Sequence, residues 1–206
     1  MLLFGVVLLV VAQAAWVWVI AHYLESLREG AWLRSAFVEG GAPLVSIIVP
    51  ARNEAHQIGK CVSSLLAQEY PAYEVIVVDD RSEDGTLEVL RGFNDSRLHV
   101  FEGAPLPEGW MGKSWANHQA VERARGRWLL FTDADTWHAP GALAATVGHA
   151  EAVGADLLSL FPFLECETFW EKLIQPAILF MIAATLPRHA LEDPSKPVAL
   201  ANGQYL

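Results

Sequence analysis

Basic residues are scarce in this chain, and the shortage excludes one class of partner. The 206 residues include 14 lysines and arginines against 24 aspartates and glutamates, which gives a net charge of −10. A nucleic-acid-binding surface needs a stripe of lysine and arginine to neutralise phosphates, and the sequence has none. We therefore expect no nucleic-acid partner. A phosphorylated ligand would need a metal ion or a few well-placed basic side chains.

Cysteine is almost absent as well. Cys61 and Cys166 are the only two, which is too few for a disulfide framework, and they do not pair as a metal-binding motif. Both are expected to be free thiols in a reducing compartment.

Charged side chains are missing altogether from residues 2–23. About 20 apolar residues suffice to cross a bilayer as a helix, so residues 1–23 are predicted to form a transmembrane anchor. A secretory signal peptide would begin with lysine or arginine and would have a shorter apolar core. A buried amino-terminal core helix is the remaining alternative.

Residues 24–43 are predicted to form a polar linker, which ends in Gly-Gly-Ala-Pro. Arg28 and Arg34 follow the predicted anchor, which favours a cytosolic location for the residues after it. The expected location is thus the inner, cytoplasmic membrane, with a single amino-terminal anchor and the domain of residues 44–206 facing the cytosol.

From Val45 onward, short β-branched runs alternate with helical spacing of apolar residues. Strands are predicted at residues 45–50, 73–78, 98–101, 127–132 and 156–160. Helices are predicted at residues 58–66, 114–125 and 140–153, and a further short helix is predicted to end at residue 90. Strands and helices that alternate in this way predict βαβ units. The expected fold class is α/β, with a mostly parallel sheet and helices on both faces.

Residues 168–187 break this alternation. They are nearly all apolar but contain Pro176, and the run is short for a membrane span, so we predict an interfacial or re-entrant helix. A kinked helix buried in the domain is the alternative. The chain ends in apolar and aromatic residues without a polar tail, so we interpret it as an amino-terminal fragment whose domain is incomplete at the carboxyl end.

Three of the predicted strands end in polar clusters, at residues 50–54, 79–82 and 133–135. The carboxyl ends of parallel strands share one edge of the sheet, and open α/β sheets bind ligands at that edge. Three clusters on one edge predict a binding site, whereas a single cluster would be a weak signal.

Asp133 and Asp135 lie one residue apart directly after a buried strand. Hard divalent cations such as Mg²⁺ bind one or two carboxylates together with phosphate oxygens. A cation would relieve the repulsion between the two aspartates and clamp a diphosphate. A capping or turn role for Asp135 ahead of Pro140 is the alternative.

The other two clusters suit a nucleoside. Asp79 and Asp80 could accept hydrogen bonds from a base or ribose, as acidic groups at strand ends do, or they could be turn residues. Asn53 is predicted to cap the following helix. Arg52 and Glu54 are either a surface pair or contacts to the nucleotide.

Gly109-Trp-Met-Gly-Lys113 is a glycine-flanked loop that opens a helix. Exposed N–H groups and the Lys113 ammonium would suit a phosphate. The glycine spacing does not match the phosphate loop of NTPases. The alternative, a solvated lysine at a helix start, would oppose the helix dipole.

Taken in order, four motifs resemble those of the family-2 glycosyltransferases with a GT-A fold: VSIIVPARNE, VIVVDDRSEDGT, GKSWANHQA and LLFTDAD. The resemblance covers residues 43–206 and implies a Rossmann-like GT-A fold. It also implies a sugar-nucleotide donor, a divalent cation (Mg²⁺ or Mn²⁺) and inversion at the anomeric carbon. The loop PEGWMGKSWA and the predicted anchor resemble the membrane-bound branch associated with hopanoid biosynthesis and carotenoid-type lipid glycosylation. That branch implies a membrane lipid, polyprenoid or hopanoid-like acceptor.

The resemblance also implies roles for residues that match its motifs. Those implied to bind the nucleotide sugar are Pro50, Arg52, Asn53, Glu54, Asp79, Asp80, Lys113 and Asp133. Asp135, together with Asp133, would bind the metal. The family's catalytic base is an acidic residue well downstream of this pair. Asp193 is a candidate, but it precedes the glycine-containing segment at residues 201–203, so we expect the base beyond Leu206 and no transfer activity from residues 1–206 alone.

Two other functions fit parts of the sequence. A non-catalytic membrane protein that binds a nucleotide sugar or a lipid could keep this scaffold and lack the base. A nucleotidyltransferase also uses metal-binding carboxylates on a Rossmann-like sheet, but it needs a glycine-rich basic loop after the first strand. The segment PARNEAHQ has no glycine, which disfavours that reading.

Overall fold

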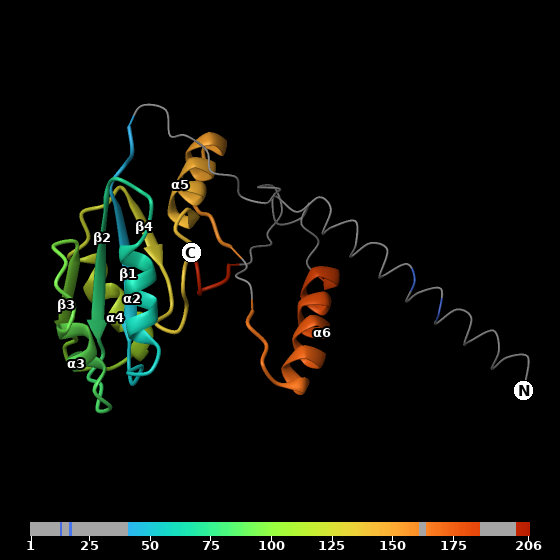
Figure 1. Ribbon diagram of the computed structural model, residues 1–206, viewed down its shortest axis with the longest axis horizontal. Coiled ribbons are helices and arrows are strands. Elements are labelled where there is room, and N and C mark those ends of the chain that lie inside the picture. The colour runs from blue at the N-terminus through green and yellow to red at the C-terminus, as the bar shows by residue number, and fades with distance from the viewer. Residues whose placement is uncertain (1–12, 14–16, 18–40, 161–163, 186–200) are drawn as a thin grey trace, which may run out of the picture. The chain divides into compact units, whose positions relative to one another are not determined.

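The computed structural model of the chain describes residues 13, 17, 41–160, 164–185 and 201–206 (Figure 1). Residues 41–160 and 201–206 belong to one compact unit, and residues 164–185 belong to another. Apart from residues 13, 17 and 41–43, the predicted anchor and linker lie outside the described residues, and so does Asp193.

The first unit is built on a four-stranded sheet in the order β3-β2-β1-β4, and every pair of neighbours is parallel. Its strands are β1 (Val45–Ala51), β2 (Tyr73–Asp79), β3 (Leu98–Glu102) and β4 (Trp128–Phe131). The two central strands are buried almost throughout, as expected for the nearly continuous apolar runs of a parallel sheet covered on both faces. These four strands lie where the sequence predicted them, within one or two residues.

Helices cover both faces of the sheet, which confirms the predicted α/β architecture. They are α2 (Ile58–Leu66), α3 (Thr86–Arg91), α4 (Gly112–Val121) and α5 (Ala142–Val153). On one face, Ala116 and Ala120 of α4 pack on Ile48, Ile76 and Val78. The buried face of α2 belongs to the larger core on the opposite side of the sheet, whose central members are Ile47, Val49, Val75 and Val77.

The predicted fifth strand, residues 156–160, is wrong. These residues form no ladder, and Leu160 only donates its N–H to the carbonyl of Tyr205, at 3.1 Å. The edge of β4 pairs instead with the last residues of the chain. Phe131 and Leu206 exchange both backbone hydrogen bonds, at 2.8 and 3.1 Å, and an antiparallel bridge joins Thr132 to Tyr205. A short apolar run is an ambiguous signal, because periodicity alone does not decide its structure.

The second unit contains α6 (Phe169–Thr185), which continues through Pro176 as one helix. Several of its large apolar side chains are exposed, among them Phe169, Trp170 and Met181. Within the described ranges, no helix combines the length and the hydropathy needed to cross a membrane. The interfacial placement expected for residues 168–187 stays a prediction.

Candidate active site

A polar cavity of about 320 Å³ lies at the carboxyl-end edge of the sheet. Its walls come from the end of β1, from the segments that follow β1, β2 and β4, and from the first two turns of α4. The lining residues are Pro50, Ala51, Arg52, Glu54, Asp80, Gly112, Lys113, Ala116, Asp133, Ala134 and Asp135. Seven of the nine residues predicted for the nucleotide and metal site are among them. Asn53 and Asp79 are the two that do not line it.

The predicted role of Asn53 as a helix cap is wrong. Helix α2 begins after Gln57, and no side chain of the described ranges caps it. Asn53 has a left-handed backbone, with φ of 56°, and its Oδ1 accepts a hydrogen bond from the N–H of Glu83 at 2.9 Å. The N–H of Glu54 in turn donates to Thr86 Oγ1 at 2.8 Å. Asn53 therefore ties the loop after β1 to the loop after β2, and this tie positions its neighbours in the cavity.

Asp79 ends β2 and is buried beneath the cavity loops, with 2% of its surface exposed. Its Oδ2 accepts a hydrogen bond from the N–H of Ser82 at 3.2 Å. Its Oδ1 is fully buried and has no partner in the described part of the chain. An unpaired buried carboxylate oxygen is costly, so a donor from outside these residues would lower the free energy of the site.

Asp80 faces into the cavity from the next position. Its Oδ2 lies 3.6 Å from Nη1 of Arg52, so the loops after β1 and β2 also meet through an ion pair. A Cβ added to Gly112 would come within 3.2 Å of the same Oδ2. The glycine thus lets the start of α4 approach Asp80 closely.

Uncharged side chains support the backbone of the Asp133–Asp135 turn. Thr136 donates its hydroxyl to the carbonyl of Asp133 at 2.7 Å, and the thiol of Cys61 lies 3.6 Å from the same carbonyl. His138 Nε2 lies 3.2 Å from the hydroxyl of Thr132. Sequence reasoning missed this support. The available signal was the pair of hydroxyl residues that flank the Asp-x-Asp motif.

Negative charge dominates the cavity. In the described part of the chain, its charged lining side chains are four carboxylates and two cations: Glu54, Asp80, Asp133, Asp135, Arg52 and Lys113. The Lys113 ammonium contacts Oδ1 of Asp133. Burial raises the pKa of the Glu54 carboxyl, and the charges of Asp135, Asp84 and Asp133 add to the rise. This excess of negative charge favours a cation as part of what binds here.

The donor set fits a hard divalent cation that shares its coordination with a ligand. Asp133 and Asp135 offer carboxylate oxygens, and no cluster of three or more histidine, cysteine or acidic side chains in the described ranges could hold a metal. Mg²⁺ and similar ions are commonly bound by one or two carboxylates, with phosphate oxygens and water completing the shell. A diphosphate would supply the missing oxygens.

Apolar side chains stand exposed on the loop beside the cavity, directly before Gly112. Leu106, Trp110 and Met111 expose 49%, 40% and 77% of their surfaces. The loop is held in place, because Trp115 Nε1 donates to the carbonyl of Ala104 at 3.1 Å and the rings of Trp110 and Trp115 pack 5.1 Å apart. We call Leu106, Trp110 and Met111 the apolar rim.

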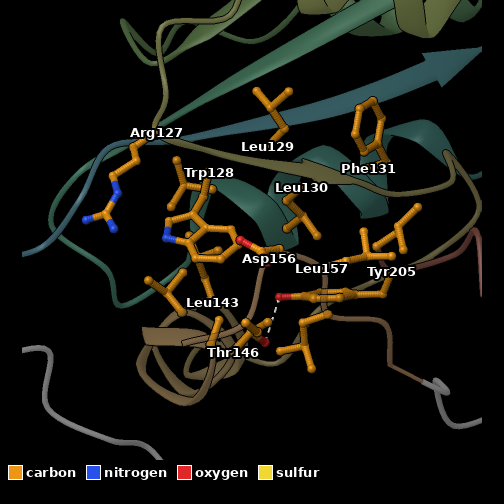
Figure 2. Close-up of a pocket in the computed structure, with 16 residues that line it drawn as sticks. Arg127, Trp128, Leu129, Leu130, Phe131, Leu143, Thr146, Asp156, Leu157 and Tyr205 are labelled. Atoms are coloured by element: carbon orange, nitrogen blue, oxygen red, sulfur yellow. Dashed lines mark hydrogen bonds between the residues drawn. The ribbon is translucent and has the colours of Figure 1, made fainter. Parts of the chain in front are cut away.

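A second cavity, of about 450 Å³, lies between the edge of β4 and α5. Figure 2 shows Trp128, Leu143 and Tyr205 around it, with the Tyr205 hydroxyl directed at Thr146, 3.0 Å away. Its lining is mainly apolar, and among the described residues Arg127 and Asp156 are its only charged side chains. It offers no arrangement of charges for transfer chemistry, so we assign it no catalytic role.

Comparison with known proteins gives one family match and several relatives. Residues 46–193 match the model of glycosyl transferase family 2. A 4,4'-diaponeurosporenoate glycosyltransferase of Staphylococcus aureus is 35% identical over 129 residues, which are 62% of this chain and 34% of that protein. The Escherichia coli protein named UDP-Glc:alpha-D-GlcNAc-diphosphoundecaprenol beta-1,3-glucosyltransferase WfgD is 38% identical over 92 residues, which are 45% of this chain and 35% of that protein.

Among solved structures, a mannosyltransferase from Pyrobaculum calidifontis, PcManGT, in complex with GDP-Man and Mn²⁺, superposes with a TM-score of 0.52. It is 30% identical, and the match covers 68% of this chain and 41% of that one. The chain spans about a third of the length of the curated relatives it matches.

Proposed function

This chain belongs to glycosyl transferase family 2, and from that premise we propose that it transfers a sugar from a nucleoside-diphosphate donor to a lipid acceptor at a membrane. The observation that carries the proposal is the cavity itself. Four segments far apart in the sequence bring seven of the predicted site residues together around one space of about 320 Å³. The α/β core with its parallel sheet is consistent with a GT-A fold.

Donor binding is supported by charge and by one structural relative. The mannosyltransferase whose fold matches was solved with GDP-Man and Mn²⁺. In this chain Asp133 and Asp135 would hold a divalent cation, Mg²⁺ or Mn²⁺. When bound, the cation would stabilise negative charge on the leaving diphosphate. Lys113 would add a positive charge on the phosphate side of the cavity, and such preorganised charges are worth most where charge develops in the transition state.

The nucleoside is expected at the loops after β1 and β2. Asp79 and Asp80 offer carboxylate oxygens as acceptors, and the buried Oδ1 of Asp79 has no other partner in the described residues. The Asn53 tie and the Arg52–Asp80 ion pair fix the two loops relative to each other. A base or ribose would therefore meet acceptors that are already in position.

Transfer with inversion requires a base that takes the proton of the acceptor hydroxyl as this hydroxyl attacks the anomeric carbon. We assign the base to a residue outside the described ranges, because the cavity carboxylates serve the cation and the nucleoside in this scheme. Asp193 is one candidate, and a residue beyond Leu206 is the one we favour. Transfer activity from residues 1–206 alone, measured beside a longer form of the protein, would contradict the second placement.

A lipid acceptor at a membrane is supported by three observations. The named relatives include glycosyltransferases of diaponeurosporenoate and of a diphosphoundecaprenol-linked sugar. Residues 2–23 carry no charged side chain. The apolar rim stands exposed beside the cavity. A polyprenoid or hopanoid-like acceptor of the membrane-bound branch would place its hydroxyl in the cavity and its hydrocarbon at the rim.

Calorimetric titration with UDP and GDP tests the donor site. We expect one of the two nucleotides to bind, and to do so only with Mn²⁺ or Mg²⁺ present. Asp135→Asn removes a charged metal ligand and should weaken this binding by about tenfold to a hundredfold, since even outer-shell partners of a metal contribute that much. Asp156→Asn, which makes the same change at the second cavity, should bind like the wild type. Equal binding by Asp135→Asn would remove Asp135 from the site.

A further inference from the structure

Lys113 lies in the first turn of α4, where a positive charge opposes the helix dipole. Its ammonium contacts Oδ1 of Asp133, and the two side chains expose 56% and 25% of their surfaces. The ion pair therefore joins the start of α4 to the Asp-x-Asp turn across the cavity. The Asp133 carboxylate in this ion pair is also one of the two that would bind the divalent cation in the proposed function.

An ammonium group and a divalent cation compete for the same carboxylate. Two positive charges on one oxygen repel each other, and Asp135 alone would leave the cation with a single protein carboxylate from this turn. The described residues offer no third histidine, cysteine or acidic ligand grouped with the pair. The pairing with Lys113 thus opposes the binding of a cation by itself.

A diphosphate changes this balance. It brings oxygens that can complete the shell of the cation, and it brings negative charge that can take up the Lys113 ammonium. Arg52 does not compete with the cation in this way, because its carboxylate partner is Asp80, which lies outside the Asp-x-Asp turn. Lys113 is the cavity cation whose partner is an expected metal ligand.

We propose that Lys113 exchanges partners, from the Asp133 carboxylate to the donor diphosphate, and that this exchange makes the divalent cation and the nucleoside diphosphate bind cooperatively. The proposal rests on the proposed function, since it takes the donor to be a nucleoside diphosphate. Coupling between two ligands is reciprocal, so the nucleotide must raise the affinity for the cation by the same factor as the cation raises that for the nucleotide. Lys113 is then a positioning residue that sets this factor.

The test compares wild type, Lys113→Met and Lys60→Met as full chains. Free Mn²⁺ is followed by electron paramagnetic resonance, first without nucleotide and then with UDP or GDP. Lys60 on α2 lies over the ring of Trp137, with its ammonium 5.1 Å from the ring centre. Lys60→Met therefore removes the same charge without removing the Asp133 contact. Circular dichroism confirms that each variant is folded, which we expect because Lys113 is mostly exposed.

Lys113→Met should bind Mn²⁺ alone about two- to fivefold more tightly than wild type, which is the range expected for the loss of a partly exposed ion pair. The factor by which nucleotide and Mn²⁺ strengthen each other should fall by about fivefold or more. Lys60→Met should match the wild type in both measurements. This pattern would support the exchange.

Four other outcomes overturn one proposal or the other. Unchanged Mn²⁺ affinity in Lys113→Met, or an equal gain in Lys60→Met, would show that Lys113 does not compete with the cation. An undiminished coupling factor in Lys113→Met would show that the diphosphate does not take up the ammonium, and the proposed function would still stand. If the wild type bound neither UDP nor GDP with Mn²⁺, the proposed function itself would fall.

Discussion

Glu74 of β2 and Arg125, which follows α4, form an ion pair at the amino ends of the central strands, opposite the cavity. The Arg125 Nε donates to Glu74 Oε2 at 2.9 Å, and the Arg125 backbone N–H donates to Oε1 at 2.9 Å. The Ser46 hydroxyl donates to Oε1 as well, at 2.7 Å. Burial raises the pKa of the Glu74 carboxyl, but the hydrogen bonds from Arg125 and Ser46 outweigh it and hold this pKa below its ordinary value of 4.5.

Glu74→Ala should lower the free energy of unfolding by about 2–4 kcal/mol, because it leaves the buried Ser46 hydroxyl without its acceptor and the Arg125 guanidinium without its carboxylate partner. Urea denaturation of the full chain measures the loss. Glu102→Ala is the matched control, since its pair with Arg91 is exposed on both sides and should contribute less than about 1 kcal/mol. The Glu74 contribution should be present above pH 4.5 and should be lost as the pH falls below it. Equal losses in the two variants would contradict the prediction.

Gly126→Ala should be more damaging than a one-carbon change suggests. A Cβ at this position would lie 2.4 Å from the backbone nitrogen of Ser46 and 2.7 Å from the carbonyl oxygen of Trp128. Both contacts are with backbone atoms, so the backbone around Gly126 would have to move away from Ser46 of β1. We expect a loss of about 1–3 kcal/mol in urea denaturation, as for other overpacked sites. Gly141→Ala, where an added Cβ meets nothing within 4 Å, should change stability little.

His138 should make the protein less stable in acid. Burial lowers the pKa of His138 from 6.5 to about 4, so the unfolded chain binds this proton more readily than the folded chain. Stability should therefore fall by about 1.4 kcal/mol per pH unit as the pH drops from 6.5 towards 4. Comparing the urea midpoints of wild type and His138→Gln between pH 4.5 and 7.5 isolates this part of the slope. Identical slopes in the two proteins would show that His138 does not titrate in this way.

The apolar rim should enter a lipid surface while the opposite end of the sheet stays in water. To test this, an environment-sensitive fluorophore is attached to the cysteine of a Met111→Cys variant. The variant also carries Cys166→Ser, so that Cys166 cannot react with the label. Cys61 should not react, because it is buried and burial raises the pKa of its thiol to about 12. On phosphatidylcholine vesicles the emission should shift to shorter wavelength. The same label at Ser96→Cys, in the exposed loop before β3, should not shift. Equal responses at the two positions would remove the rim from the membrane contact.

Local sequence patterns predicted β1 and β2 well because both strands are continuous β-branched runs, which suit the buried centre of a parallel sheet. The position of the cavity followed from the same strand predictions, since parallel strands end at a common edge of the sheet. Asp133 and Asp135 were therefore placed at this edge without any knowledge of side-chain contacts. Glu54 and Lys113 were placed beside them because their loops follow β1 and open α4.

The missed features depend on contacts between distant residues. Asparagine is a common helix-capping residue, yet the hydrogen-bond partner of Asn53 is the N–H of Glu83 in another loop. Residues 156–160 have the composition of a strand, yet residues 205–206 occupy the edge of β4. Spacing along the chain gives no information about which of two apolar segments pairs with an edge. The support behind Asp133 is hidden for the same reason, because Cys61 lies 72 residues away.

The Thr132 hydroxyl donates to the carbonyl of Gln204, 72 residues further along the chain, at 2.8 Å. A ribosome that adds about 5–20 residues per second needs roughly 4–14 s to cover that distance. During this interval the nascent chain already contains the Asp133–Asp135 turn but lacks the segment that closes it against β4. The central strands can pair early, whereas the cation-binding turn gains its last support only when residue 204 has emerged. Donor binding should accordingly be a late event in the biogenesis of this protein.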